Sequence, residues 1–217
     1  MQPYYEADGI TIYHGDCREI REWLKADVLI TDPPYGMAYV SSMTAERRPV
    51  LGDEDTRARD EVLRDWGSRP AAVFGTWRVQ RPPGTRQIVT WYKSGSGLGM
   101  GDLSMPWGCV TEEIYILGHG WTGARRPNVI ITTGQRGGAH GPSARLGHPT
   151  PKPVGLMSQL VEAAPPGLIA DPFMGVGATL LAARDLGHRA SGIELEERYC
   201  EIAARRLDQG VLNFGAA

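Results

Sequence analysis

Cysteine is scarce in this chain. Its 217 residues include three cysteines, Cys17, Cys109 and Cys200, which are odd in number and far apart. This pattern excludes a disulfide framework, and it contains no pair of thiols at the short interval that zinc sites use. We therefore expect a protein of a reducing cytoplasm and assign no metal ligand.

The chain also lacks a long apolar run. It has no stretch of 18 apolar residues, and no basic segment followed by an apolar one at its start. A membrane-spanning helix needs about 20 apolar residues, so we expect no membrane partner and no targeting segment. The length suffices for one α/β domain with a sizeable core and hardly for two.

The net charge is small, but the charges are unevenly distributed. The chain carries -2 overall, whereas residues 66–161 hold ten Lys or Arg and three acidic residues, a net +7 that leaves -9 for the remainder. Such a basic segment is typical of a protein that presents one face to a polyanion. Ordinary variation over a solvated surface is the alternative that charge alone leaves open.

Strand-like apolar runs alternate with amphipathic segments along most of the chain. We expect strands at residues 10–14, 28–30, 71–75, 87–92, 112–117, 129–132, 168–170 and 190–193. Helices are expected at about 17–24, 56–66, 153–164, 179–186 and 196–207, and loops at 37–49 and 134–147. This alternation predicts an α/β fold.

The first motif directly follows a strand. The apolar run at residues 28–30 ends in Asp32-Pro33-Pro34-Tyr35. Prolines lack the N–H group that a strand needs, so the strand must end there. The Asp32 carboxylate, the Pro33 carbonyl and the Tyr35 ring are thereby placed at the carboxyl end of a strand, where open α/β sheets bind ligands.

These groups suit chemistry at the exocyclic amine of adenine or cytosine. The lone pair of that amine is delocalised into the ring, which makes the amine a poor nucleophile. A carboxylate and a carbonyl can accept its two protons and favour a tetrahedral nitrogen, while Tyr35 stacks on the base. A proline-rich turn with Asp32 as an ordinary turn residue is the alternative.

The second motif opens the last third of the chain. The loop Asp171–Thr179 follows an apolar strand, contains Gly175 and Gly177, and leads into a helix. Glycines let the backbone pass close to a ligand, and a helix amino terminus offers N–H groups to an anion. Glu194 follows Gly175 by nineteen residues, near the spacing at which an acid binds ribose hydroxyls. A tight strand-to-helix turn, with Glu194 as an acid at a helix start, is the alternative.

Together the two motifs resemble those of S-adenosylmethionine-dependent DNA amino-methyltransferases. Their order, with the catalytic motif first and the cofactor motif last, resembles the permuted beta group of that family. Gly15-Asp16-Cys17, before the catalytic strand, and the segment His148–Pro153, before the cofactor half, are further matches. The resemblance spans almost the whole chain.

The resemblance implies a role for each motif residue. Asp32, Pro33 and Tyr35 would hold the target base, and Pro34 would shape the turn. Glu194 would bind the ribose of S-adenosylmethionine. The full set implied to bind this cofactor is Asp16, Cys17, Asp32, Lys152, Asp171, Phe173, Gly175, Gly177, Thr179 and Glu194, with Asp16 at the adenine and Lys152 near the methionine end. Val176 and Ala178 replace Ser and Thr of the family's loop, so hydroxyl contacts there are not carried over.

The resemblance also implies the fold. We expect a doubly wound, mostly parallel seven-stranded methyltransferase sheet with one antiparallel strand and helices on both faces. In space, the strands would follow the order of those that begin at residues 10, 190, 168, 28, 71, 87 and 112, the last being antiparallel. One domain would span residues 1–217, with a catalytic half at about 1–117, a short loop-rich recognition insert at about 118–147 and a cofactor half at about 148–217.

Double-stranded DNA is the partner that the resemblance implies. Adenine N6 is the expected target, because Asp at the head of the motif accompanies adenine more often in the family, and the base would be flipped out of the duplex. Cytosine N4 methylation and a catalytically idle S-adenosylmethionine-binding module are the alternatives. The predicted DNA contacts are Arg47, Arg48, Arg125, Arg126 and Arg136. Because the insert is short, either its loops suffice for recognition or a homodimer supplies the rest.

Overall fold

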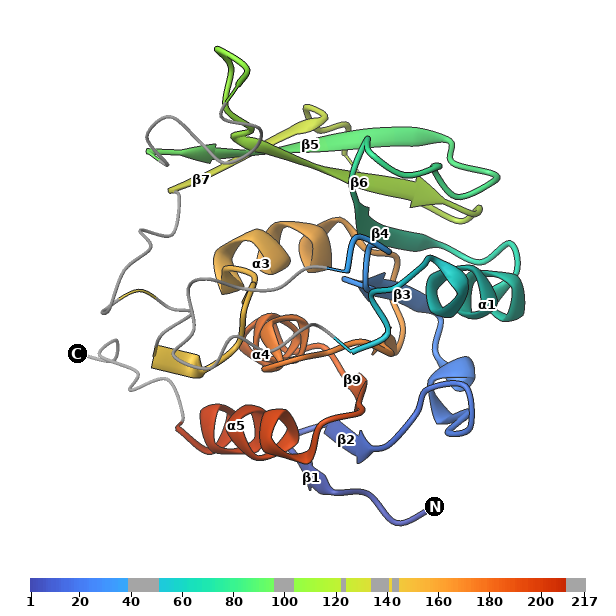
Figure 1. Ribbon diagram of the computed structural model, residues 1–217. Coiled ribbons are helices and arrows are strands. Elements are labelled where there is room, and N and C mark those ends of the chain that lie inside the picture. Colours follow the sequence, from blue (N-terminus) through green and yellow to red (C-terminus); the bar gives the residue numbers. More distant parts are fainter. Residues whose placement is uncertain (39–50, 96–103, 122–123, 134–140, 142–144, 210–217) are drawn as a thin grey trace, which may run out of the picture.

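The protein is built around one nine-stranded sheet with helices on both faces (Figure 1). The computed structural model describes residues 1–38, 51–95, 104–121, 124–133, 141 and 145–209. The strands are β1 (Tyr5–Ala7), β2 (Ile10–His14), β3 (Val28–Thr31), β4 (Ala71–Gly75), β5 (Gln87–Ser94), β6 (Thr111–Leu117), β7 (Val129–Thr133), β8 (Ile169–Asp171) and β9 (Ala190–Glu194). The helices are α1 (Arg57–Trp66), α3 (Val154–Ala163), α4 (Ala178–Asp185) and α5 (Glu197–Asp208), with a 3-10 turn η1 (Glu22–Lys25).

The centre of the sheet is parallel. The spatial order is β1-β2-β9-β8-β3-β4-β6-β5-β7, and each neighbouring pair from β2 to β4 runs in the same direction. Every residue of β3 is buried, as expected for a parallel strand that is covered on both faces. The α/β fold class predicted from the alternating pattern is therefore confirmed.

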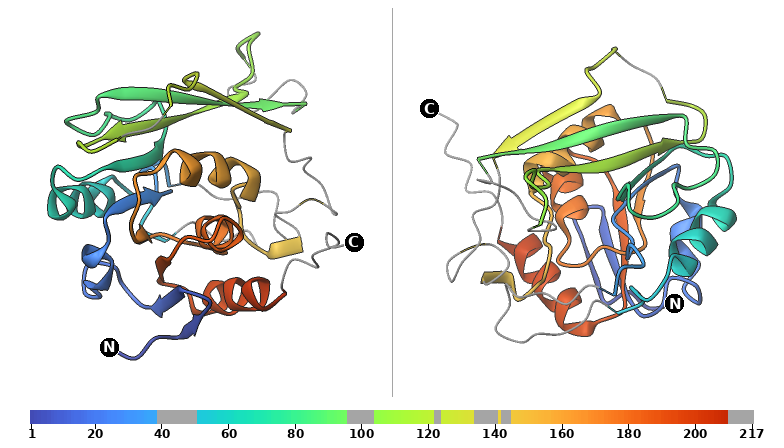
Figure 2. Two further views of the ribbon diagram at one scale, coloured as in Figure 1. Left: turned by 180° about the vertical axis from the view of Figure 1, so that it is seen from behind. Right: turned by 45° about the horizontal axis from the view of Figure 1, so that its top comes forward.

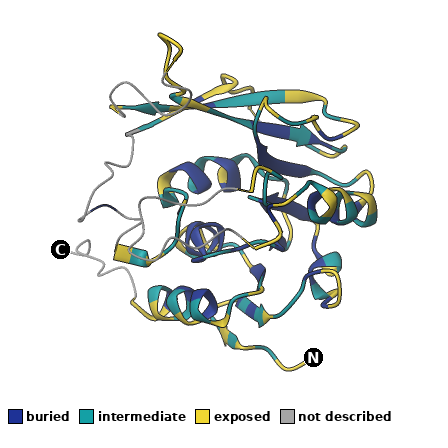
Figure 3. Cartoon of the chain, in the orientation of Figure 1, coloured by how far each residue is buried: buried dark blue, intermediate teal, exposed yellow. Residues whose placement is uncertain are grey.

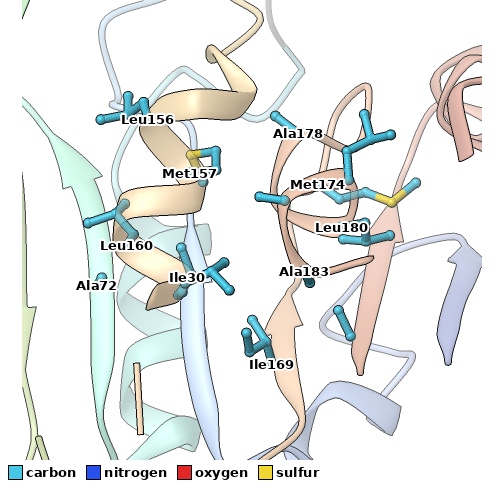
Figure 4. Close-up of a cluster of buried hydrophobic side chains, with 14 of the residues drawn as sticks. Ile30, Ala72, Leu156, Met157, Leu160, Ile169, Met174, Ala178, Leu180 and Ala183 are labelled. Carbon is cyan, nitrogen blue, oxygen red and sulfur yellow. The ribbon is translucent and has the colours of Figure 1, made fainter. Parts of the chain in front are cut away.

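Alternate residues of β3 face two different cores. Val28 and Ile30 belong to a core that includes buried residues of α3, α4 and α5, whereas Leu29 belongs to a second core formed with α1 and η1. Figure 4 shows Ile30 beside Leu160 of α3 in the first core. Figure 3 shows burial concentrated in α3, α4 and the central strands. The period-two alternation of side chains along a strand thus places a helical layer on each face.

The far edge of the sheet differs from the expected order. The prediction placed the strand at 87 beside the strand at 71 and the strand at 112 at the edge, but β6 lies between β4 and β5 and is antiparallel to both. That β6 runs antiparallel is confirmed, while its edge position is wrong. The residues of β6 that pair with β4 are largely apolar and buried, so they belong in the sheet interior. Parallel pairing of β7 with β5 extends this edge above α3 (Figures 1 and 2).

The prediction missed the strand at the other edge. β1 forms an antiparallel hairpin with β2, with Ala7 opposite Ile10. Asp8 and Gly9 make the two-residue turn with φ values of 50° and 76°, the backbone that tight hairpins require. A strand was predicted at 129–132 but not placed in the sheet, and this strand, β7, together with β1 gives the sheet of the described residues nine strands in place of the predicted seven.

The expected helix at 17–24 is also wrong. Only the short turn η1 forms there, although Ile20 and Trp23 are buried as an amphipathic helix would require. The indole N–H of Trp23 donates to the Cys17 carbonyl at 2.8 Å, so this carbonyl accepts from a side chain six residues ahead. A continuous α-helix would instead pair it with a backbone N–H four residues ahead.

The two ends of the described chain meet at the β1 edge. The Tyr5 hydroxyl donates to Asp208 at the end of α5, at 3.0 Å. The closing helix α5 thus finishes beside the first strand. Within the described ranges, no helix is long and apolar enough to cross a membrane.

Replacing Gly118 with Ala should destabilise the fold. Gly118 follows β6 with φ of +73°, and a Cβ atom there would lie 1.9 Å from the Arg69 carbonyl oxygen, a backbone atom that cannot rotate away. We expect the free energy of unfolding to fall by about 2–4 kcal/mol, from backbone strain and steric overlap together.

Gly155→Ala is the matched control for this substitution. Gly155 lies in α3, and a Cβ atom there would meet no atom within 4 Å. Alanine has the higher helix propensity, so this variant should gain about 0.5 kcal/mol. Urea unfolding measures both changes, and equal stabilities of the two variants would contradict the packing described at Gly118.

Candidate active site

The predicted site residues meet at one edge of the sheet. The carboxyl ends of the parallel strands β2, β9, β8, β3 and β4 lie at this edge, and a cavity of about 770 Å³ opens there. This volume is in the range of small-molecule and cofactor sites. From the predicted set, the cavity is lined by Asp16, Cys17, Asp32, Pro33, Pro34, Tyr35, Lys152, Asp171, Phe173, Gly175, Thr179 and Glu194.

A direct contact joins the two motifs. β3 pairs with β8, so the loops that follow these strands begin side by side. The Thr31 hydroxyl donates to the buried Asp171 carboxylate at 2.7 Å, and the Thr179 hydroxyl donates to it at 2.5 Å. The Phe173 amide donates to the same carboxylate at 3.2 Å. The hydrogen bond from Thr31 to Asp171 thus holds the glycine loop against the end of β3, and Thr179 fixes the same carboxylate from the start of α4.

Burial strongly affects the ionisation of Asp171. It raises the pKa of this carboxyl to about 6, against the hydrogen bonds from Thr179 and Thr31, which lower it. Asp171 is therefore mainly ionised at neutral pH and accepts hydrogen bonds from all three donors.

Glu194 is held in the cavity by two backbone amides. One carboxylate oxygen accepts from the Gly175 amide at 3.0 Å, and the other accepts from the Glu196 amide at 2.8 Å. Burial raises the pKa of Glu194 to about 7, although these two hydrogen bonds lower it. Each oxygen still has a lone pair, so the carboxylate can accept hydrogen bonds from a hydroxyl-bearing ligand.

His148 packs directly against the glycine loop. A Cβ atom at position 175 would lie 2.9 Å from His148 Nε2, so only glycine fits there without displacing the ring. The Thr150 amide donates to His148 Nδ1 at 3.2 Å, which leaves the proton on Nε2. The loss of water around the ring, together with the charges of Lys152, Arg198 and Arg206, lowers the pKa of His148 to about 3. His148 is therefore neutral at physiological pH.

Asp32 lies at the centre of a cluster of charged groups. Its Oδ1 accepts from the Tyr35 hydroxyl at 2.8 Å, and its Oδ2 pairs with the Lys152 ammonium at 2.7 Å. Burial raises the pKa of Asp32, although the Lys152 charge opposes this effect. Burial alone would lower the pKa of Lys152, but Asp32 and Glu112 outweigh it and raise that pKa to about 12. Lys152 therefore remains a cation beside the catalytic motif.

Two members of this cluster were missing from the predicted site. Glu112 on β6 pairs with Lys152 at 3.2 Å and with Lys93 on β5. Burial would raise the pKa of Glu112, but Lys152 and Lys93 outweigh it and lower this pKa. The sequence did show a carboxylate at the start of a strand that continues with apolar residues, which could have marked Glu112 as a candidate. Its contact with Lys152, however, follows only from the strand order.

The remaining predicted residues lie at the margins of the site or away from it. Asp16 is held by Arg18, whose guanidinium Nη2 lies 2.5 Å from the carboxylate and lowers its pKa. Gly177 does not line the cavity. It caps α4, and a Cβ atom there would lie 2.9 Å from Ala203 of α5, so its absence of a side chain serves helix packing.

The predicted DNA contacts are only partly visible. Arg125 and Arg126 are exposed, and the Arg126 guanidinium lies 3.3 Å from the Glu162 carboxylate of α3. Arg47, Arg48 and Arg136 lie outside the described residues. Within the described ranges, no group of three or more His, Cys, Asp or Glu side chains is arranged to hold a metal ion.

Comparison with known proteins identifies relatives of this chain. A family model described as DNA methylase matches residues 121–205. The type II methyltransferase M.ScaI of Streptomyces caespitosus is 38% identical to this chain. The alignment is 272 positions long and covers 95% of this chain and 84% of that protein. Identity at this level over nearly the whole chain establishes a family relationship.

Solved structures show the same fold. The crystal structure of an M1.HpyAVI-SAM complex superposes with a TM-score of 0.63 at 20% identity, covering 92% of this chain and 99% of that one. The cytosine-N4-specific PvuII DNA methyltransferase superposes with a TM-score of 0.62 at 14% identity, covering 99% and 91% respectively. At these identities the likeness is evidence for the fold alone.

Replacing His148 with Gln should change how stability depends on pH. The unfolded chain binds a proton at this residue near pH 6.5, whereas the folded protein keeps the ring neutral until about pH 3. The stability from this difference is present above pH 6.5 and is lost as the pH falls towards 3. As the pH falls through this range, the free energy of unfolding of the variant should therefore decrease less steeply than that of the wild type. The two slopes should differ by up to about 1.4 kcal/mol per pH unit.

Urea unfolding of the ligand-free protein between pH 7 and pH 4.5 measures this slope. The wild-type protein unfolded in the same buffers is the reference for this comparison. Identical slopes for wild type and His148→Gln would show that the His148 ring is not held neutral.

Proposed function

Because the chain belongs to the DNA amino-methyltransferases, the S-adenosylmethionine-dependent family that modifies adenine N6 or cytosine N4, we propose that it methylates adenine N6 in DNA. The observation that carries this proposal is the shared rim of the two motif loops. Asp32 follows β3, and the glycine loop follows β8, its direct neighbour. A methyl donor held by one loop can therefore face an amine held by the other.

The catalytic loop provides the groups that an amine needs. Asp32 and the Pro33 carbonyl accept hydrogen bonds from the two amine protons, which favours the tetrahedral nitrogen of the transition state. The Tyr35 hydroxyl is anchored by Asp32 at 2.8 Å, so its ring has a defined position in the cavity. We propose that the ring stacks on the target base, which has been flipped out of the duplex.

The cofactor half fits S-adenosylmethionine at several points. Glu194 keeps free lone pairs for ribose hydroxyls. Gly175 has no side chain, so a ligand in the cavity can approach the backbone of the loop. Phe173, Asp16 and Cys17 line the same cavity and are proposed to contact the remainder of the cofactor. When bound, S-adenosylmethionine would supply the methyl group of its sulfonium, with the bond from carbon to the amine nitrogen forming as the carbon–sulfur bond breaks and the neutral thioether S-adenosylhomocysteine leaving.

The contribution of the protein is positioning and charge. Asp32 stabilises the positive charge that develops on the amine nitrogen and then accepts its proton. Lys152 is already charged at neutral pH, because its pKa is raised to about 12, so it cannot act as the base. No cysteine is needed as a nucleophile, since the transfer is direct.

Adenine is proposed ahead of cytosine because of the first residue of the catalytic motif. Asp32 occupies that position, and in the family that the motifs resemble Asp accompanies adenine more often. The physical argument treats both amines alike, so cytosine N4 is the alternative outcome of the experiment below. A role in restriction-modification belongs to the same proposal, because the relative M.ScaI is a type II methyltransferase.

Double-stranded DNA is the proposed macromolecular substrate. The insert at about 118–147, which carries Arg125 and Arg126, is proposed to contact it, with Arg47, Arg48 and Arg136 as further contacts. Only part of this insert belongs to the described residues. A homodimer that completes the recognition surface is a further element of the proposal.

Replacing Asp32 with Ala should abolish methyl transfer and leave the affinity for S-adenosylmethionine nearly unchanged. The variant loses the acceptor for the amine but keeps Glu194 and the glycine loop. Transfer of labelled methyl groups to unmethylated DNA, followed by digestion to nucleosides, measures activity and product together. Label in N6-methyladenine is expected, label in N4-methylcytosine would favour the alternative, and label in neither would favour an idle module.

Asp65→Ala is the control for the Asp32 variant. Asp65 lies in α1 and pairs with Arg21 on the surface, at 2.5 Å. This control should remain active. An active Asp32→Ala variant would contradict the role assigned to Asp32.

Replacing Arg125 with Ala should weaken DNA binding and reduce its dependence on salt. Arg125 is exposed, whereas Arg126 also contacts α3 through Glu162, so Arg125 gives the cleaner test. Loss of one phosphate contact reduces the slope of log affinity against log salt by about 0.9. Binding titrations at several salt concentrations measure this slope, with Arg205→Ala on α5 as the control. An unchanged slope for Arg125→Ala would remove this residue from the interface.

A further inference from the structure

Glu112 is one of two acidic residues at the start of β6, an interior strand that continues with apolar residues. β6 pairs with β4 on one side and with β5 on the other, and residues 114, 115 and 117 of β6 are buried. The Glu112 side chain is 20% exposed and lines the same cavity as Asp32. A carboxylate in this position is costly unless cations and donors compensate it.

The compensation comes from both sides of the cavity. One oxygen of Glu112 pairs with Lys93 of the neighbouring strand β5. The other oxygen lies 3.2 Å from the Lys152 ammonium and 3.3 Å from the Tyr35 hydroxyl oxygen. Glu112 therefore contacts both Lys152 and Tyr35, the two side chains that also contact Asp32.

Lys152 is shared between two carboxylates. Its ammonium lies 2.7 Å from Asp32 and 3.2 Å from Glu112, and its side chain is only 8% exposed. The cluster of Asp32, Glu112, Lys93 and Lys152 contains two anions and two cations, so its net charge is zero. Without the Glu112 charge, Lys152 would have Asp32 alone as its anionic partner, and the cluster would carry a net positive charge.

That charge balance bears on the reaction proposed above. The amine nitrogen becomes positive as it is methylated, so an uncompensated cation beside it would raise the energy of the transition state. An ammonium paired fully with Asp32 would also compete with the amine for the lone pairs of the carboxylate. Both effects oppose transfer while leaving the cofactor loop unchanged.

We propose that Glu112 is a positioning residue for methyl transfer, which shares the Lys152 ammonium with Asp32 so that Asp32 keeps a lone pair for a hydrogen bond from the target amine. This inference rests on the proposed function. Glu112 acts through Lys152 and does not contact the reacting atoms. Lys93 fixes the opposite oxygen of Glu112 and thereby the direction of its carboxylate.

Glu112→Gln tests this role because it removes the charge and keeps the size of the side chain. We expect kcat for methyl transfer to fall by about 10- to 100-fold, the range associated with misplaced catalytic groups. KM for S-adenosylmethionine and for DNA should stay within about twofold. Glu112→Asp, which keeps the charge, should retain more activity than the Gln variant.

The pH profile separates this role from a merely structural one. The charged groups that face Asp32 are Lys152 from the segment before α3, Glu112 from β6 and Asp171 from β8. Among them, Glu112 raises the pKa of Asp32, so its removal should shift the acid limb of kcat/KM to lower pH. A variant that is only less stable would lower activity without moving this limb.

Glu201→Gln is the control for loss of an ion-paired carboxylate. Glu201 pairs with Arg205 on the surface of α5, away from the cavity, and its variant should keep wild-type kinetics. Thermal unfolding of each variant shows that the folded protein is being assayed.

The outcomes separate this inference from the proposed function. If the wild-type protein methylates DNA and Glu112→Gln has the same kcat and the same acid limb as the wild type, the inference is overturned and the proposed function stands. No methylated nucleoside from the wild-type protein would overturn both. A lowered kcat with a shifted acid limb, partly restored in Glu112→Asp, would support the inference.

Discussion

The hydrogen bond between Thr31 and Asp171 joins the two halves of the site. It links the last residue of β3 to the last residue of β8, two strands separated by 140 positions in the chain. Because the strands are parallel neighbours, the loops that follow them cannot diverge until after this contact. Asp32 and the glycine loop are therefore close together as a consequence of the sheet topology, before any other side chain of the cavity is considered.

Paired charges organise the rest of the cavity. Asp32, Glu112, Lys93 and Lys152 neutralise one another where their side chains are largely buried and an unpaired ion would be costly. Glu194 and Asp171 instead depend on hydrogen bonds from backbone amides and hydroxyls, and burial raises the pKa of both carboxyls. The Asp32 side of the cavity thus has balanced ions, whereas the Glu194 side has carboxylates held by hydrogen-bond donors. This division fits an amine that becomes positive and a cofactor that carries a ribose.

Much of this arrangement could be predicted from the sequence, because local patterns specify the parallel core. The limits of β2 and β4 match the predicted ranges, since apolar runs bounded by glycine and polar residues define them. The placement of β6 between β4 and β5 was not predicted, since strand order depends on long-range pairing. Glu112 was missed for the same reason, since the residues next to it in the sequence do not indicate a contact with Lys152. The missed β1 is different, because the Asp8-Gly9 turn was a local signal.

The central claim is that one rim holds both the methyl donor and the target amine. A crystal structure of the protein with S-adenosylmethionine bound tests it most directly. The account predicts the cofactor in the cavity between the glycine loop and Glu194, with its methyl group directed towards Asp32. A cofactor bound elsewhere, or bound there with its methyl group directed away from Asp32, would contradict the account.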